Sequence, residues 1–142
     1  MKYFGSVFEC RQERNEDLMR AYHEQIIACD IILMPDIFKR LVNMPSKRFW
    51  VSEERAAIVI ASMLHGDTLS KMRSTKREMF FEIYSRVLVI RKANPNMSVY
   101  EMVSKVVRQP APKFYLTPDS AKVMFYKIKK QWFEKRMQRW QR

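Results

Sequence analysis

The sequence predicts an all-α protein made of two tandem three-helix repeats, and three observations lead to this fold class. First, a motif in residues 41–56 recurs 65 positions later, in residues 106–121. Second, the chain has only two glycines and is rich in residues of high helix propensity. Third, apolar residues recur at helical spacing along most of the chain. A repeat at fixed spacing sets the architecture, so we expect two copies of one small unit, packed as one compact body.

The two copies of the motif share four identical residues and six chemically similar pairs. The identical pairs are Val42/Val107, Pro45/Pro110, Phe49/Phe114 and Ala56/Ala121. The similar pairs are Leu41/Val106, Arg48/Lys113, Trp50/Tyr115, Val51/Leu116, Ser52/Thr117 and Glu54/Asp119. Proline stops a helix and the aromatic residues favour extended backbone, so the motif predicts a linker between two helices.

The first predicted repeat covers residues 15–67 and follows an N-terminal arm, residues 1–14. Asn15 and Ser52 are residue types that cap helix N-termini, and Gly66 is typical of a helix end. The predicted elements, in order, are an extended arm or short strand over 2–10, a helix over 16–31, a short helix from Pro35 to Val42, an extended linker over 44–51 and a helix from Ser52 to Gly66.

The second predicted repeat covers residues 68–142 and follows the same plan. Ser98 with Glu101 forms a capping box, and Thr117 with Pro118 predicts another helix start. The predicted elements, in order, are a helix over 76–92, a turn at Asn94-Pro95-Asn96, a short helix from Ser98 to Val107, an extended linker over 109–116 and a last helix behind Thr117.

Positive charge is concentrated in the second half of the chain. The whole chain carries a net charge of +12. Residues 1–67 hold nine Lys/Arg and ten Asp/Glu, a net charge of −1, whereas residues 68–142 hold eighteen and five, a net charge of +13. This imbalance favours a polyanionic partner for the second half, most often nucleic acid. An anionic membrane or an acidic protein is the alternative.

Two interpretations of the repeated motif stay open. Alternation along an extended linker puts Phe49 and Val51 on one face, and Arg48 and Trp50 on the other, outward face. In the second copy the outward residues are Lys113 and Tyr115. In the first interpretation the motif is structural, with the apolar residues as core anchors. In the second, the outward face binds nucleic acid, because a cation and an aromatic ring beside a helix N-terminus can hold a phosphate and stack on a base. The second copy is then the favoured site, because Glu53 and Glu54 add negative charge beside the first.

The last helix carries the strongest charge signal. Its apolar stripe, suited to a core, is Ala121, Met124, Phe125, Ile128 and Trp132. Its remaining surface holds the cations Lys122, Lys129, Lys130, Lys135, Arg136, Arg139 and Arg142. These form a solvated face, a phosphate-binding face or a membrane- or partner-binding helix. Near the C-terminus, apolar residues either cover the first repeat or form a homo-oligomer seam: Trp132, Phe133, Met137 and Trp140.

A three-helix unit with an exposed third helix resembles helix-turn-helix proteins at the level of the fold, which implies a helix in the DNA major groove. The usual short turn is replaced here by about eight to nine residues, counted along the sequence. We find no catalytic constellation, metal-ligand spacing or cofactor motif, so the sequence predicts no enzyme and no cofactor. It also predicts no membrane span and a cytoplasmic location.

These observations predict a non-enzymatic nucleic-acid-binding protein, with DNA preferred over RNA. The basic second repeat and the last helix would supply most of the affinity by neutralising phosphates. The predicted contact residues are Lys113, Tyr115, Lys122, Lys129, Lys130, Arg136 and Arg139, with Arg48 and Trp50 from the first repeat. The alternative is a protein-interaction or assembly module that uses the aromatic residues of the last helix.

Overall fold

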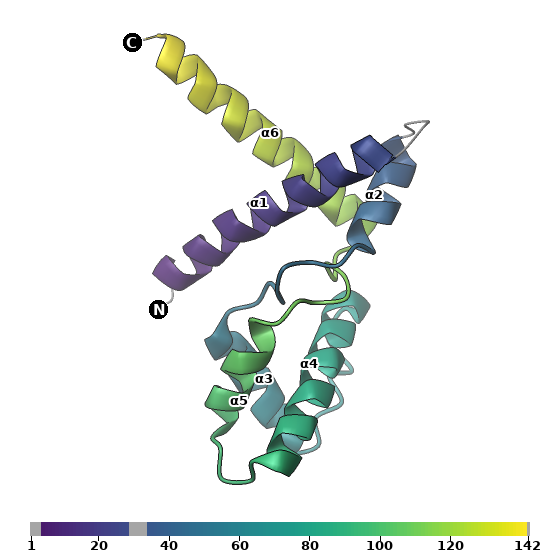
Figure 1. Cartoon of the computed structure of the whole chain (residues 1–142), viewed down its shortest axis with the longest axis vertical. Coiled ribbons are helices and arrows are strands. Elements are labelled where there is room, and N and C mark those ends of the chain that lie inside the picture. Colours follow the sequence, from purple (N-terminus) through teal and green to yellow (C-terminus); the bar gives the residue numbers. More distant parts are fainter. Residues whose placement is uncertain (1–3, 29–33, 142) are drawn as a thin grey trace.

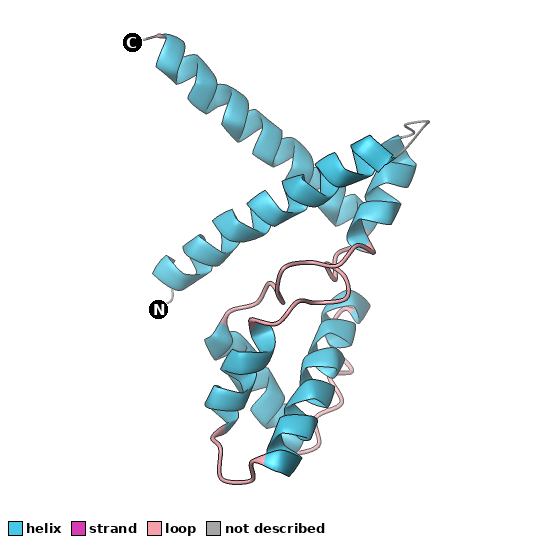
Figure 2. Cartoon of the chain, in the orientation of Figure 1, coloured by secondary structure: helices cyan, strands magenta, loops and turns pink. Residues whose placement is uncertain are grey.

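The computed structural model describes residues 4–28 and 34–141, and this part of the chain is helical with no strand (Figures 1 and 2). The helices, in chain order, are α1 (Phe4–Ala28), α2 (Met34–Val42), α3 (Glu53–Leu64), α4 (Ser74–Ala93), α5 (Val99–Val107) and α6 (Pro118–Trp140). An all-α fold was predicted from the sequence and is confirmed.

The helices pack in two groups of three. Helix α3 packs against α5 and α4, and α4 packs against α5. Helix α6 packs against α2 and α1, and α1 packs against α2. We call the first group the continuous bundle, because its helices are consecutive, and the second the terminal bundle, because it contains the first and the last helix (Figure 1). The helices of each predicted repeat, 15–67 and 68–142, are thus divided between the two bundles.

Each bundle has its own apolar core. The core of the continuous bundle includes Ala56, Ile60, Phe80, Ile83, Val87, Met102, Val103 and Val106. The core of the terminal bundle includes Leu18, Ala21, Phe38, Leu41, Ala121, Phe125 and Ile128. In the terminal bundle Phe125 of α6 contacts rings of α1 and α2, with centroid distances of 4.2 Å to Tyr22 and 5.5 Å to Phe38. Burial of such a ring stabilises the packing by about 2–3 kcal/mol.

The helix starts follow the predicted capping residues. The side chains of Ser52, Ser98 and Thr117 each accept a hydrogen bond from the backbone N–H three residues later, at 3.1–3.2 Å. Each cap satisfies one of the backbone N–H groups that an α-helix leaves without a partner in its first turn. Helix α3 ends before Gly66, whose φ of +102° suits glycine. The predicted starts of α3, α5 and α6 and the predicted end of α3 are therefore confirmed.

The predicted N-terminal arm is wrong. Residues 4–14 belong to α1, and Asn15 lies inside that helix rather than at its N-cap. Straight-chain residues of high helix propensity over 11–14 let the helix continue, and an interior Asn costs less than about 1 kcal/mol. The predicted C-terminal end of this helix, residues 29–31, lies outside the described residues.

Two linkers, residues 43–52 and 108–117, cross between the bundles. Ser46 and Ala111 form an isolated antiparallel bridge, with N–H···O distances of 3.1 and 3.0 Å. Further out, Phe49 N–H donates to the Val107 carbonyl at 3.0 Å. On the other side, the N–H of Phe114 donates to the carbonyl of Val42 at 3.1 Å. These backbone hydrogen bonds hold the crossing point together.

The linker side chains alternate between the two cores, not between core and solvent. Phe49 contributes to the core of the continuous bundle, whereas Trp50 packs against that of the terminal bundle. In the second linker the assignment is reversed, with Phe114 in the terminal core and Tyr115 in the continuous core. The predicted alternation is therefore present, but its outward face is a second core because each linker lies between two bundles.

Candidate nucleic-acid interface

Two of the predicted contact residues, Arg48 and Trp50, are held by bonds within the protein. The indole N–H of Trp50 donates to the carboxylate of Asp17 at 3.0 Å. The Arg48 guanidinium donates to the carbonyls of Phe49 (3.2 Å) and Val51 (3.3 Å), and lies 5.5 Å from the centroid of the Trp50 ring. The structure thus brings this cation and this ring together, as predicted, but in a contact that fixes the first linker.

Asp17 is the polar centre of this contact and was not predicted. It is 1 % exposed and accepts from the Arg20 side chain at 2.9 and 2.6 Å and from the backbone N–H of Lys47 at 2.8 Å, besides Trp50. These bonds tie α1 to the first linker. Asp17 adjoins Leu18 on α1, so the signal in the sequence was a carboxylate next to the apolar face of a helix.

Tyr115 is buried, so the predicted outward orientation of this ring is wrong. It is 9 % exposed and stacks on Phe49 with the centroids 6.0 Å apart. Its φ of +58° is in the left-handed region, which is costly for a bulky residue. Lys113 lies 5.4 Å from the ring centroid and donates to Glu78 at 2.7 Å. Tyr115 therefore does not present a face for base stacking.

The buried position of Tyr115 predicts a specific loss of stability at alkaline pH. Burial, and next the charge of Glu82, raise the pKa of Tyr115 from 10.0 to about 12. The unfolded chain loses the phenol proton first, so this contribution is complete below pH 10 and disappears between pH 10 and 12. Tyr115→Phe should reduce the loss of stability over this pH range, measured by urea denaturation. The control is Tyr126→Phe, which changes an exposed ring and should lose as much stability between pH 10 and 12 as the wild type. If Tyr115→Phe lost as much stability as the wild type, the loss would not come from Tyr115.

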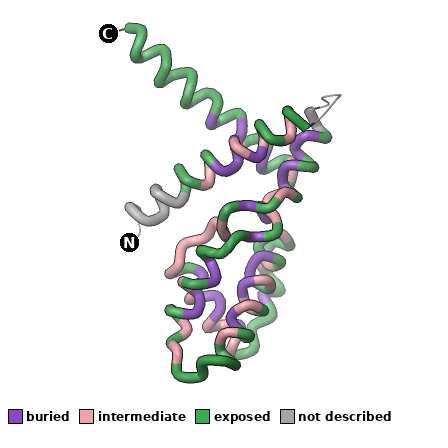
Figure 3. Tube along the Cα trace, in the orientation of Figure 1, coloured by how far each residue is buried: buried purple, intermediate pink, exposed green. Residues whose placement is uncertain are grey.

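The predicted contacts on α6 are at the surface. Lys122, Lys129, Lys130, Arg136 and Arg139 are all exposed. Only the first half of α6 contributes buried residues, and residues 129–141 are exposed without exception (Figure 3). The second half of α6 therefore projects from the terminal bundle and presents its cations to solvent.

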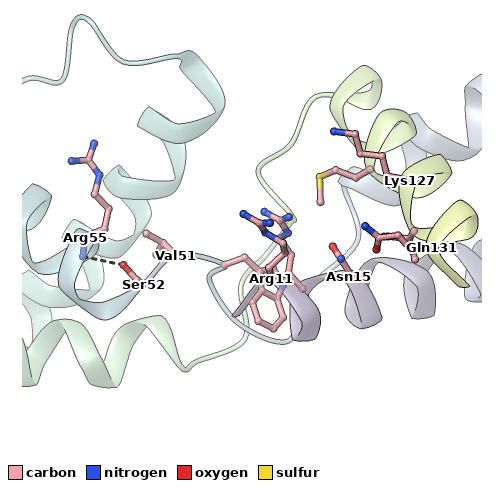
Figure 4. A pocket seen from close by; sticks show the side chains of 11 residues that line it. Arg11, Asn15, Val51, Ser52, Arg55, Lys127 and Gln131 are labelled. Carbon is pink, nitrogen blue, oxygen red and sulfur yellow. Dashed lines mark hydrogen bonds between the residues drawn. The ribbon is translucent and has the colours of Figure 1, made fainter. Parts of the chain in front are cut away.

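A cleft of about 620 Å³ lies among α1, α6, the first linker and the start of α3 (Figure 4). The lining residues are Arg11, Arg14, Asn15, Trp50, Val51, Ser52, Arg55, Met124, Lys127, Ile128 and Gln131. Four of them are cationic and none is a carboxylate. Figure 4 shows Arg11 and Lys127 on the side of α1 and α6, and Arg55 beside Ser52 at the start of α3. The fold thus concentrates positive charge from three separate helices.

The acidic residues in the first turn of α3 do not line this cleft. The Glu53 carboxylate accepts hydrogen bonds from Tyr100 and Ser104 of α5, each at 3.3 Å, and from Arg108 at 2.9 Å. Glu54 is also outside the lining. The sequence predicted that these two carboxylates would make the first linker the weaker site. The cations that line the cleft instead lie beside the first linker. They come from helices that are distant in the sequence, so no sequence motif groups them.

Comparisons with family models, with curated proteins and with solved structures found no match. Across residues 4–28 and 34–141, no helix combines the length and the apolar character that a membrane span requires. In the same residues, no three His, Cys, Asp or Glu side chains are grouped as a metal ion would need.

Proposed function

We propose that this chain is a non-enzymatic nucleic-acid-binding protein that contacts the phosphate backbone, with DNA preferred over RNA. The observation that carries the proposal is the cleft, whose lining includes Arg11, Arg14, Arg55 and Lys127 and no carboxylate. Lys127 also belongs to α6, so the charged lining continues onto the exposed cations of that helix. A cytoplasmic location is part of the same proposal.

Phosphate neutralisation explains why such a surface would bind a polyanion. Each phosphate that pairs with Lys or Arg releases condensed counterions, so the affinity falls as the salt concentration rises. On duplex DNA the logarithm of the affinity falls with the logarithm of the salt concentration, with a slope of about −0.9 per phosphate contact. The N–H groups at the start of α3 add positive potential beside Ser52. The proposal rests on phosphate contacts and needs no helix inserted into the major groove. Helix α3 buries Ala56, Val59, Ile60 and Met63 against other helices.

We further propose that the fold arose by tandem duplication, with the third helices of the two repeats exchanged. The crossing of the linkers supports this. The bridged residues Ser46 and Ala111 are 65 positions apart, the period of the sequence motif. The two outer hydrogen bonds, Phe49 to Val107 and Phe114 to Val42, also change into each other when that offset is applied. Such paired bonds are expected of two equivalent units related by a pseudo-twofold axis.

The nucleic-acid proposal is tested by fluorescence anisotropy with labelled duplex DNA, single-stranded DNA and duplex RNA over a salt series. We expect the tightest binding to duplex DNA and a steep fall of affinity with salt. Changing both Arg55 and Lys127 to Gln should weaken binding about tenfold or more at low salt and reduce the salt slope by about two. The matched control changes Arg91 and Lys92, in the last turn of α4, to Gln.

The results separate the alternatives clearly. A similar loss in both double variants would show non-specific attraction by net charge, without a role for the cleft. No binding of any oligonucleotide at low salt would remove the proposal. The assembly alternative is favoured by the exposure of Phe133 (61 %) and Trp140 (81 %). Removal of residues 132–142 discriminates, because loss of self-association with unchanged oligonucleotide affinity would support assembly.

A further inference from the structure

Helix α6 carries two apolar stripes, and the structure covers only one of them. The inner stripe, Ala121, Phe125 and Ile128, is buried in the terminal bundle. The outer stripe consists of Val123 (55 % exposed), Tyr126 (48 %), Phe133 (61 %), Met137 (43 %) and Trp140 (81 %). Exposed apolar residues are ordinary when scattered, but a row along one face of a helix, here interrupted only by Lys130, marks an interaction surface.

The spacing of the outer stripe is that of a helix–helix seam. With Lys130 included, its members follow one another at intervals of three, four, three, four and three residues. This is the a/d pattern of a heptad repeat, which keeps one side of a helix facing a partner helix. The inner stripe and Trp132, four residues after Ile128, lie on the opposite side. The predicted seam of Trp132, Phe133, Met137 and Trp140 is therefore divided between two faces.

The charges beside the outer stripe define the chemistry of its partner. The flanking positions are Lys122, Lys127, Lys129, Glu134 and Arg136, and all are exposed. Lys130 adds a cation within the stripe itself. Four of the five flanking residues are thus cationic, and flanking charges decide which helices pair in a coiled coil. An approaching helix must offer carboxylates at its own flanking positions to match them.

A second copy of α6 does not meet this requirement. In a parallel pair Lys130 would lie opposite Lys130 of the other copy. In an antiparallel pair the flank of Lys122, Lys129 and Arg136 would lie against itself. Like charges at these positions oppose pairing. Single-stranded nucleic acid fits the cations and has rings to stack on at Tyr126, Phe133 and Trp140. The positions between these rings, Val123, Lys130 and Met137, offer none, whereas the apolar side chains of a helix pack against the whole row.

We propose that the outer stripe of α6 binds an acidic amphipathic helix of another protein, as a two-stranded coiled coil. The apolar residues of that helix pack between Tyr126, Phe133, Met137 and Trp140, and its carboxylates pair with the cationic flanks. The apolar part of this site is separate from the cleft that the nucleic-acid proposal uses, since none of these four residues lines the cleft. The two sites share one flanking cation, Lys127, which lines the cleft.

The test uses the full chain and two synthetic three-heptad peptides, each with Leu at a and d. One carries Glu at e and g, and the other carries Lys there. By fluorescence anisotropy, the acidic peptide should bind the wild type and the basic peptide should not. The double variant Phe133→Ser/Met137→Ser keeps every charge and should bind the acidic peptide at least tenfold more weakly. Trp132→Ser, an exposed apolar change on the other side of the helix, should remain within twofold of the wild type.

Three results would overturn the inference. The first is an acidic peptide that does not bind, or that binds the wild type and the double variant equally. The second is a wild-type dimer in sedimentation velocity that the double variant loses, which would make a second copy the occupant. The third is a double variant that binds a 20-base single strand more weakly than the wild type does, while neither protein binds the acidic peptide. That result would make nucleic acid the occupant. Because the variants keep all cations, failure here leaves the cleft proposal intact.

Discussion

Replacing Asp17 by alanine should lower the free energy of unfolding by about 3 kcal/mol. The carboxylate is 1 % exposed and accepts hydrogen bonds from the Arg20 side chain, the Lys47 backbone and the Trp50 indole. Its removal leaves an N–H of the linker and an N–H of the indole without their acceptor. It also leaves Arg20 without its nearest counter-charge. Breaking a buried ion pair and its hydrogen bonds from one side costs about 3–5 kcal/mol, and the part-exposed guanidinium places this site at the lower end.

Urea denaturation of wild type and variant measures this loss, and Glu24→Ala is the matched control. Glu24 also binds Arg20, at 2.9 Å, but its side chain is 51 % exposed. An exposed pair of this kind contributes less than about 1 kcal/mol. If Asp17→Ala and Glu24→Ala reduced the free energy of unfolding equally, the burial of Asp17 and its bonds to the linker would contribute nothing to stability.

Helix starts were predictable because their chemistry is local. Ser52, Ser98 and Thr117 each accept a hydrogen bond from the N–H three residues ahead, so both partners lie within one short stretch of sequence. Asn15 has the same capping chemistry, yet the chain continues as helix through it. A cap competes with helix propensity on its N-terminal side, and the residues before Asn15 favour helix.

The environment of each linker was not predictable in the same way. Alternation correctly indicates that Phe114 and Tyr115 point to opposite faces. It does not indicate what covers each face, and here the second bundle covers the one expected to meet solvent. The burial of Tyr115, which is 9 % exposed, is thus a property of tertiary packing alone. For the same reason Arg11 and Arg55 could not be predicted as site residues, because they line the same cleft as Lys127 only in the folded chain.

The division of each predicted repeat between two bundles could not be predicted from the sequence either. Amphipathic helices with apolar faces such as those of α3 and α6 can close a bundle within their own repeat or in the other one. The contacts that decide between these two packings are distant along the chain. In the structure α3 packs with α4 and α5, and α6 packs with α1 and α2. This arrangement changes which fragments of the chain contain a complete core.

A fragment of residues 47–116 should therefore fold alone, whereas the predicted first repeat, residues 1–67, should not. The first fragment holds α3, α4 and α5 together with Phe49, Ala111 and Tyr115, which complete the core of the continuous bundle. Seventy residues with such a core are enough for an independent domain. The fragment 1–67 holds α1 and α2 without α6, so Phe38 and Leu41 lose the partners that Phe125 and Ile128 supply.

Thermal unfolding followed by circular dichroism distinguishes the two fragments. The fragment 47–116 should give a cooperative transition, and its midpoint should not depend on concentration. The fragment 1–67 should give a broad, weak transition, and adding the complementary fragment 68–142 should restore a sharp one, because each supplies a helix that the other lacks. Alanine at Phe125 in the added fragment should abolish the recovery of the terminal bundle, since that ring fills the space between Tyr22 and Phe38. A cooperative monomeric transition of 1–67 alone would show that α3 can close its own repeat. The exchange of helices would then not be what stabilises this fold.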